Sequence, residues 1–287
     1  MTAGLLKKLW RFALPGVLLL MTVGGSQAQT FTLTHNGWTY YEDVASQGWG
    51  SFTDPNNTNH MYQNWWWFRT NLDSKEKPLA DLTSMMSGGA TNVNLVFTED
   101  AGSLQNALLF NLTYTLTGIS STMAKVDIAW SVRNIYGQQP QPITVNFFAY
   151  SDFDLNGSAG GDSGVLVDPQ TIRYTEGTTA VDVTASSGSL QGYDVDNYPN
   201  LLNLLNDSAV YNVSNSGLPF GPGDMTNVFQ WRATLGMGQQ MTGTLTKLIN
   251  LEHTPPPPPP PVIPEPGTWM LMLSGIVPVA LRVRRKA

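Results

Sequence analysis

The chain contains no cysteine, only three histidines and 13% charged residues among its 287 residues. The absence of cysteine excludes a disulfide framework, thiolate zinc sites and cysteine catalysis. No two histidines stand four positions apart and no His-Glu-x-x-His motif occurs, so a zinc hydrolase is not indicated. No glycine-rich loop leads from an expected strand into an expected helix, so nucleotide binding has no support either.

The chain is also short of basic residues, except at its two ends. Residues 29–254 contain eight lysines and arginines against twenty aspartates and glutamates, a formal charge of −12, whereas the whole chain carries −6. Proteins that bind nucleic acid present basic surfaces. The sequence therefore predicts an acidic body that does not bind nucleic acid, flanked by two basic segments.

Residues 1–28 have the composition of a secretory signal peptide. Three basic residues precede an apolar segment, residues 12–23, and the small residues Ser26 and Ala28 mark a cleavage site. This apolar segment has 12 residues, whereas a helix that spans a membrane needs about 20. We therefore expect cleavage after Ala28 and export of the remaining chain.

The other end of the chain combines a stiff spacer with a membrane segment. Residues 255–263 form a linker that opens with seven consecutive prolines, which adopt polyproline II and span roughly 20 Å at about 3.1 Å per residue. Residues 264–287 then contain Pro264-Glu265-Pro266, an apolar stretch over 268–281, and a basic end with Arg282, Arg284 and Arg285. A basic end favours the cytoplasmic side, so we expect a short transmembrane helix with the body outside.

The order of Pro-Glu-Pro, short hydrophobic helix and terminal arginine cluster resembles the PEP-CTERM sorting signal of Gram-negative bacteria. The resemblance covers residues 262–287. It implies recognition by an exosortase, a membrane-embedded enzyme that cuts near Pro264-Glu265-Pro266, and transient membrane anchoring through the C-terminal helix. It also implies a final location at the cell surface or in an extracellular polysaccharide matrix such as that of a biofilm.

Apolar and polar residues alternate with a period of two through the body, residues 29–254. Strands are expected over 91–98, 108–116, 126–132, 143–149, 165–167, 171–175, 180–185, 209–213, 227–235 and 241–249, and one helix over 199–205. Antiparallel strands with one apolar face bury that face most simply in two packed sheets. We therefore predict a single all-β domain, an antiparallel β-sandwich of the jelly-roll or supersandwich kind.

Four consecutive aromatic residues, Trp65-Trp66-Trp67-Phe68, form the first candidate site. Alternate side chains on a strand point to opposite faces, so a one-sided core accepts one pair of them. The other pair would offer ring faces for stacking on sugars, with Trp65, Trp66 and Trp67 as candidates. A strand buried on both faces explains the same pattern, because aromatic residues dominate core burial.

Residues 152–158 contain the second candidate site. Aspartate at the first and third places, asparagine at the fifth and glycine at the sixth reproduce the start of a calcium-binding loop. The predicted metal ligands are Asp152, Asp154, Asn156, Ser158 and Asp162. The twelfth position is a serine instead of glutamate and the loop follows a strand, which excludes an EF-hand. An acidic turn without metal is the alternative, because Asp and Asn also hydrogen-bond to their own backbone in turns.

Three functions are compatible with these features. The main expectation is a non-enzymatic structural or adhesive protein of the cell surface or extracellular matrix, processed by an exosortase. The alternative is a carbohydrate-binding module that uses the aromatics at 65–68, and a third hypothesis is a polysaccharide hydrolase or lyase. The acidic residues are numerous enough for a glycosidase pair, but no motif selects two of them. No catalytic residue is assigned, calcium is the one candidate cofactor, and the expected partners are the exosortase and extracellular polysaccharide.

Overall fold

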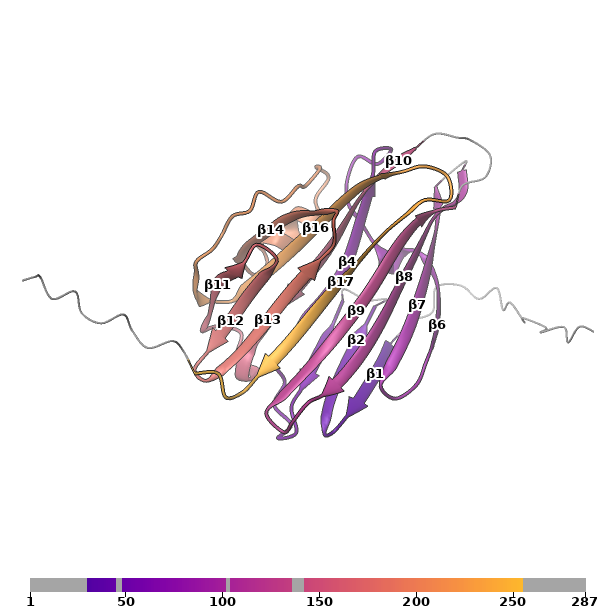
Figure 1. Cartoon of the computed structure of the whole chain (residues 1–287). Helices are drawn as coiled ribbons and strands as arrows, with labels where there is room; N and C mark the ends of the chain where they lie inside the picture. Colours follow the sequence, from indigo (N-terminus) through magenta and orange to yellow (C-terminus); the bar gives the residue numbers. More distant parts are fainter. Residues whose placement is uncertain (1–29, 45–47, 102–103, 136–141, 255–287) are drawn as a thin grey trace, which may run out of the picture. The chain divides into compact units, whose positions relative to one another are not determined.

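A computed structural model describes residues 30–44, 48–101, 104–135 and 142–254 (Figure 1). The predicted signal peptide, proline linker and sorting segment lie outside the described residues. The described part is all-β, and every pairing between its named strands is antiparallel, which confirms the predicted class. No helix within these ranges is long and apolar enough to cross a membrane.

The largest sheet contains nine strands, which run side by side in Figure 1. Its central strands are long, and its two edges are formed by short strands. In spatial order the strands are β15 (Phe220–Gly223), β11 (Asp162–Asp168), β12 (Thr171–Glu176), β13 (Thr179–Ser186), β17 (Gln240–Asn250), β9 (Met123–Asn134), β8 (Leu104–Gly118), β7 (Asn92–Ala101) and β6 (Thr83–Gly88).

Two smaller sheets and one helix complete the described part. The five-stranded sheet has the order β14 (Leu190–Asn197), β16 (Met225–Leu235), β10 (Ile143–Asp152), β4 (Gln63–Thr70) and β5 (Lys77–Pro78). The three-stranded sheet consists of β1 (Thr30–His35), β2 (Trp38–Asp43) and β3 (Gly50–Thr53). Helix α1 covers Asn200–Asn206, and single 3-10 turns cover Leu79–Asp81 and Leu155–Gly157.

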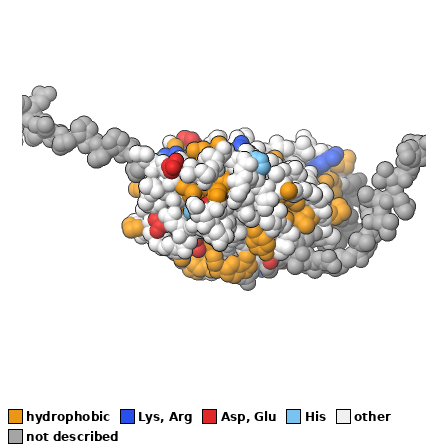
Figure 2. All heavy atoms as spheres, turned by 90° about the horizontal axis from the view of Figure 1, so that it is seen from below, with side chains coloured by type: hydrophobic (Ala, Val, Ile, Leu, Met, Phe, Trp, Pro, Cys, Tyr) orange, Lys and Arg blue, Asp and Glu red, His pale blue; other side chains and the backbone are white. Residues whose placement is uncertain are grey.

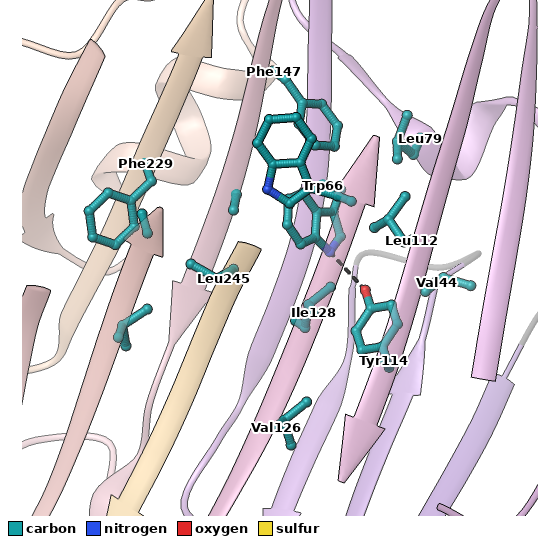
Figure 3. Packing of buried hydrophobic residues seen from close by; sticks show 14 of the residues in the cluster. Val44, Trp66, Leu79, Leu112, Tyr114, Val126, Ile128, Phe147, Phe229 and Leu245 are labelled. Carbon is teal, nitrogen blue, oxygen red and sulfur yellow. Dashed lines mark hydrogen bonds between the residues drawn. The ribbon is translucent and has the colours of Figure 1, made fainter. Parts of the chain in front are cut away.

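The core lies between the inward faces of the nine-stranded and five-stranded sheets. Phe147 of β10 is at its centre, stacked on Trp66 with ring centroids 5.0 Å apart (Figure 3). Its ring also lies 5.7 Å from Phe110 and 5.2 Å from Trp130 of the opposite sheet. Trp66 donates a hydrogen bond from Nε1 to the Tyr114 hydroxyl at 2.8 Å, so the two sheets are joined by polar as well as apolar contacts.

The outer face of the five-stranded sheet is buried as well. Trp65, Trp67, Phe148 and Tyr150 on this face pack under α1 and the segment that follows it, through residues including Leu205. This explains the run of four aromatic residues, because β4 needs apolar side chains on both of its faces. The alternative of a doubly buried strand is the one that the structure shows.

Most expected elements are found, with two exceptions. The expected helix corresponds to α1, and nine of the ten expected strands agree with observed strands to within a few residues. The prediction of a strand over 209–213 is wrong, since these residues form an irregular cover for the outer face. The acidic segment 193–197, where no strand is expected, belongs to β14.

A buried polar chain crosses the core. The ammonium of Lys247 on β17 is fully buried and donates to Asn64 Oδ1 at 2.7 Å. Asn64 in turn donates to the Glu42 carboxylate at 2.8 Å, and Glu42 accepts from Tyr40 at 2.7 Å and from Tyr114 at 3.0 Å. Burial raises the pKa of Glu42 to about 7 and lowers the pKa of Lys247 to about 7.

The surface is poor in charge. The face in Figure 2 carries hydrophobic side chains in separate patches between mostly uncharged polar atoms. Several exposed apolar residues lie at or next to the edges of the nine-stranded sheet: Met85 and Met86 on the edge strand β6, and Val165, Leu166 and Val167 on β11, the strand next to the other edge. Scattered exposed apolar residues are normal on soluble proteins.

Replacement of Phe147 by alanine tests the position of the core. We expect Phe147→Ala to lower the free energy of unfolding by about 3–5 kcal/mol, because a fully buried ring between two sheets leaves a cavity. Urea denaturation of the full chain measures this loss. Leu72→Ala, at a side chain that is 64% exposed, should change stability by less than about 0.5 kcal/mol. Equal midpoints for the two variants would contradict the assignment.

Candidate functional site

Four strand ends meet at one end of the five-stranded sheet. Strands β4, β10, β16 and β14 are neighbours and run antiparallel, so the starts of β4 and β16 lie beside the ends of β10 and β14. The residues at or next to these ends are Tyr62, Asp152, Asp224 and Tyr198. The Tyr62 amide donates to the Asp152 carbonyl at 2.9 Å, and the Tyr198 amide donates to the Asp224 carbonyl at 2.8 Å. The register of the sheet therefore gathers residues that are distant in sequence.

Three carboxylates form a cluster at this place, which we call the acid cluster: Asp152, Asp154 and Asp224. Each contributes an oxygen, and these oxygens all lie within 4.8 Å of one another. Asp152 is buried at 1% exposure, whereas Asp154 and Asp224 are half-buried. Asp152 Oδ1 makes no hydrogen bond within the described part of the chain. Negative charge is thus concentrated where few donors balance it.

A fourth acid lies behind the cluster. Asp162 begins β11, and its backbone pairs with Gly223, the residue before Asp224. Its side chain is fully buried, and neither carboxylate oxygen makes a regular hydrogen bond to the described residues. The backbone amide of Leu155 partly offsets its charge, and the charges of Glu176, Asp154 and Asp224 add to its repulsion.

Burial and repulsion between these groups shift their ionisation. Desolvation, followed by the charges of Asp224 and Asp154, raises the pKa of Asp152 to about 8. Desolvation and Asp224 raise the pKa of Asp154 to about 6, and desolvation with neighbouring acids raises the pKa of Asp162 to about 8. The carboxyl groups of Asp152 and Asp162 therefore keep their protons near neutral pH unless a cation takes the place of the protons.

Only part of the predicted calcium loop enters the acid cluster. Asp152 and Asp154 belong to it, and Asp162 lies next to it. Asn156 turns away, since its Nδ2 donates to the Glu176 carboxylate at 2.9 Å and its Oδ1 accepts from Thr179 at 2.7 Å. The Ser158 hydroxyl donates to the Gly160 carbonyl at the surface. The expectation that Asn156 and Ser158 join these ligands is wrong, because the chain makes a 3-10 turn in which Asn156 has a φ of 57°.

Asp224 was not expected from the sequence. No spacing connects it with the loop at 152–158, because it comes from the start of a different strand. Its approach depends on the pairing of β10 with β16, in which Asp152 stands opposite Thr226.

Three aromatic side chains lie beside the acid cluster, and we call them the aromatic row: Trp49, Tyr62 and Tyr198. Trp49 and Tyr62 have ring centroids 4.7 Å apart at 83°, and Tyr62 and Tyr198 have centroids 6.0 Å apart at 89°. Trp49 is 40% exposed and the two tyrosines are half-buried. Desolvation raises the pKa of Tyr62, and the charges of Asp152 and Asp154 add to this effect, which reflects their proximity.

The backbone holds Trp49 in a fixed position. Its carbonyl accepts from the Asp43 amide at 2.7 Å, and it forms a β-bridge with Gln63. Gly48 before it has a φ of +64°, and a Cβ there would lie 2.6 Å from the Asn64 carbonyl oxygen. Glycine is therefore required at this position.

The tryptophans expected to stack on sugars are not available for it. The exposed fractions of Trp65, Trp66 and Trp67 are 8%, 2% and 1%, so the prediction that these side chains stack on sugars is wrong. Both faces of β4 are covered, by the opposite sheet on one side and by α1 on the other. Within the described ranges the exposed aromatic residue is Trp49, a single tryptophan between glycines, for which the sequence pattern provides no signal.

Comparisons with known proteins identify the fold. No family model matches the chain, and no curated protein sequence matches it. A bacterial glucoamylase solved in complex with acarbose is similar over 79% of this chain and 34% of its own, with a TM-score of 0.51 and 9% identity. A GalM/aldose epimerase homologue from C. elegans is similar over 79% of this chain and 100% of its own, with a TM-score of 0.46 and 9% identity. A polysaccharide lyase is similar over 76% of this chain and 33% of its own, with a TM-score of 0.42 and 9% identity.

These comparisons correct the main functional expectation. The chain spans about a third of the glucoamylase chain, and the likeness at 9% identity concerns the fold alone. The glucoamylase, which shares this fold, is a carbohydrate-active enzyme, so the expectation of a non-enzymatic structural or adhesive protein is corrected.

The raised pKa values predict how stability responds to pH when divalent cations are removed. The folded protein keeps protons on Asp152 and Asp162 that the unfolded chain releases above about pH 4, so their contribution is largest at low pH and is lost towards pH 8. Between pH 5 and 7, we expect wild-type protein in EDTA to lose up to about 1 kcal/mol per pH unit relative to Asp162→Asn. Urea denaturation of both proteins measures the difference.

Comparison with the variant removes the other groups that titrate in this range. Glu42 has a raised pKa and, like Asp162, lowers the free energy of unfolding as pH rises, whereas His60, whose pKa is lowered by burial, increases it. Both groups are present in the wild type and in the variant. Lys247 contributes only above about pH 7. If the free energy of unfolding changed with pH in parallel for wild type and variant, a raised pKa of Asp162 would be refuted. Six further titratable groups interact electrostatically with the acid cluster or with Asp162: Tyr62, Tyr150, Tyr174, Tyr198, Glu176 and Lys247.

Proposed function

We propose that this protein is an exported carbohydrate-binding protein that stacks a neutral polysaccharide on the aromatic row. The observation that carries the proposal is Trp49, which is 40% exposed and contacts Tyr62 edge to face, with Tyr198 on Tyr62 in turn, beside a group of carboxylates. Sugar rings present C–H groups that pack on aromatic faces, while their hydroxyls need hydrogen-bonding partners at the rim. Both kinds of contact are available at this end of the sheet.

The position of the rings favours binding with little loss of conformational entropy. Trp49 is fixed by the bridge to Gln63, and the amides of Tyr62 and Tyr198 are bonded to the backbone of the acid cluster. Binding sites with rigid aromatic residues lose less freedom on association than flexible loops do. The half-buried carboxylates of Asp154 and Asp224 supply acceptors for sugar hydroxyls.

The charge of the protein favours a neutral ligand. The body carries a formal charge of −12, which includes the carboxylates of the acid cluster. Like charges disfavour association with an anionic polymer. A neutral glucan or mannan is therefore the ligand class that we assign.

A second candidate function is cleavage of the bound polysaccharide. Asp154 and Asp224 have oxygens within 4.8 Å, and the pKa of Asp154 is raised to about 6, as expected for a general acid. Glycosidases use two carboxyl groups on either side of the scissile bond. Release of reducing ends that is lost in Asp154→Asn would make this protein a hydrolase.

Export and sorting are part of the same proposal. The signal peptide would direct the chain out of the cytoplasm, and an exosortase would then process the segment 264–287 and release the body from its transient membrane anchor. The proline linker would hold the body, which we regard as a β-sandwich of the supersandwich kind, away from the membrane until that step. The final location is the cell surface or an extracellular polysaccharide matrix.

Substitution of Trp49 tests the carbohydrate site. We expect Trp49→Ala to weaken binding of a neutral polysaccharide about tenfold, which corresponds to about 1.4 kcal/mol, because the exposed stacking face is removed. Affinity electrophoresis against a panel of neutral and anionic polysaccharides measures the change. Met237→Ala, at an exposed side chain beyond the opposite end of β16, is the matched control. Unchanged retention of Trp49→Ala on every polymer that binds wild type would sink the proposal.

The sorting signal is tested separately in a host that contains an exosortase. Replacement of Pro264, Glu265 and Pro266 by alanine should leave a full-length precursor in the membrane fraction, whereas wild type is shortened and leaves it. Immunoblots of fractionated cells show the difference. Identical processing of both proteins would show that this motif is not the recognition signal.

A further inference from the structure

We propose that the acid cluster is a calcium site, in which Asp152, Asp154 and Asp224 bind one Ca²⁺ with Asp162 behind them. The proposal goes beyond carbohydrate binding and does not depend on it. Three observations support it: the spacing of the carboxylates, the buried oxygens that lack partners, and the absence of nitrogen or sulfur ligands among the described residues of the cluster.

The spacing fits a single ion. Calcium binds carboxylate oxygens at about 2.3–2.6 Å, so ligands on one ion lie up to about 5 Å apart. The three oxygens from Asp152, Asp154 and Asp224 are all within 4.8 Å of one another. They come from the end of β10, the turn after it and the residue before β16, and the pairing of β10 with β16 holds these segments close together.

The buried oxygens point to a cation that is not part of the chain. Asp152 is 1% exposed; its Oδ2 accepts from the Tyr150 hydroxyl at 3.4 Å, whereas its Oδ1 has no partner among the described residues. Asp162 is fully buried, and the backbone amide of Leu155 is the one group of the described chain that partly offsets its charge. Burying carboxylates without partners costs several kcal/mol in general. The buried ammonium of Lys247 acts on Asp152, but it donates hydrogen bonds to Asn64 Oδ1 and Met61 Sδ. A bound divalent cation would satisfy these carboxylates.

The ligand set favours calcium over other metals. All the acidic side chains offer oxygen, which suits hard cations, whereas zinc and copper prefer nitrogen or sulfur. Asp154 and Asp224 are half-buried, so water has access to complete a shell of six to eight ligands. Magnesium requires a near-ideal octahedron at about 2.0–2.1 Å, which ligands fixed by three backbone segments do not readily supply.

Calorimetry and thermal unfolding of the full chain test the site with calcium alone. At pH 8, CaCl₂ at about a hundredfold excess over Kd should raise Tm by about 5 °C relative to EDTA, and MgCl₂ should have a smaller effect. Because calcium displaces protons, its affinity should fall by up to about tenfold per displaced proton for each pH unit below 8. Asp224→Asn should abolish the calcium shift, whereas Asp81→Asn, at an exposed acid far from the cluster in sequence, should retain it.

Several controls make the outcome clear. Asp224→Asn should be at least as stable as wild type in EDTA, because it removes repulsion, and this shows that a lost calcium shift is not a folding defect. Asp154→Asn serves as a second variant if the first does not fold. Trp49→Ala should keep the calcium shift, which separates the metal site from the sugar site. No calcium-dependent heat or Tm shift in wild type at pH 8, or an equal shift in both ligand variants, would overturn the proposal.

Discussion

The buried ammonium of Lys247 holds together the polar interior on which the two sheets depend. It comes from a central strand of the nine-stranded sheet and donates a hydrogen bond to Asn64 of the five-stranded sheet. Asn64 in turn donates a hydrogen bond to Glu42 of the three-stranded sheet. Removing a partner from such a chain would leave a buried charge unbalanced, which costs more than the net stability the intact contact provides. This series of hydrogen bonds therefore specifies how the three sheets meet. Lys247 also acts on the charge of Asp152, so the interior network and the acid cluster share one cation.

Double burial of β4 and β10 decides where a site can form. Their side chains are covered on both faces, by the nine-stranded sheet and by α1 with its following segment, so polar groups reach water chiefly at the strand ends. The acid cluster and the aromatic row occupy one such end. Sites supported by strands in this way are more precisely placed than sites on long loops. The fold thus explains why carboxylates with raised pKa values are held close together despite their repulsion.

The sequence predicts the strands well where alternation is regular, as in β8 and β9, and poorly where polar residues serve a buried role. Lys247 stands on the inward face of β17, where the pattern alone would place an apolar residue. Asp194 interrupts the apolar pattern of β14, yet it belongs to this strand and is buried, because its carboxylate accepts hydrogen bonds from the amides of Ser214 and Ser216. Two of the five residues predicted from local spacing, Asp152 and Asp154, belong to the acid cluster, but Asp224 requires the β10–β16 register. Long-range pairing of this kind is not visible in a single sequence.

The acid cluster and the aromatic row are connected through the backbone, which has a consequence for binding. Tyr62 is bonded to the carbonyl of Asp152 and Tyr198 to that of Asp224, so any shift of the cluster moves the rings on either side. An ion that draws Asp152 and Asp224 together would fix the spacing of the two tyrosines, and a ligand stacked on the tyrosines would favour the same spacing. Such coupling is reciprocal by thermodynamic necessity. A calcium-dependent sugar affinity would therefore arise from the strand ends alone, without direct contact between ion and sugar.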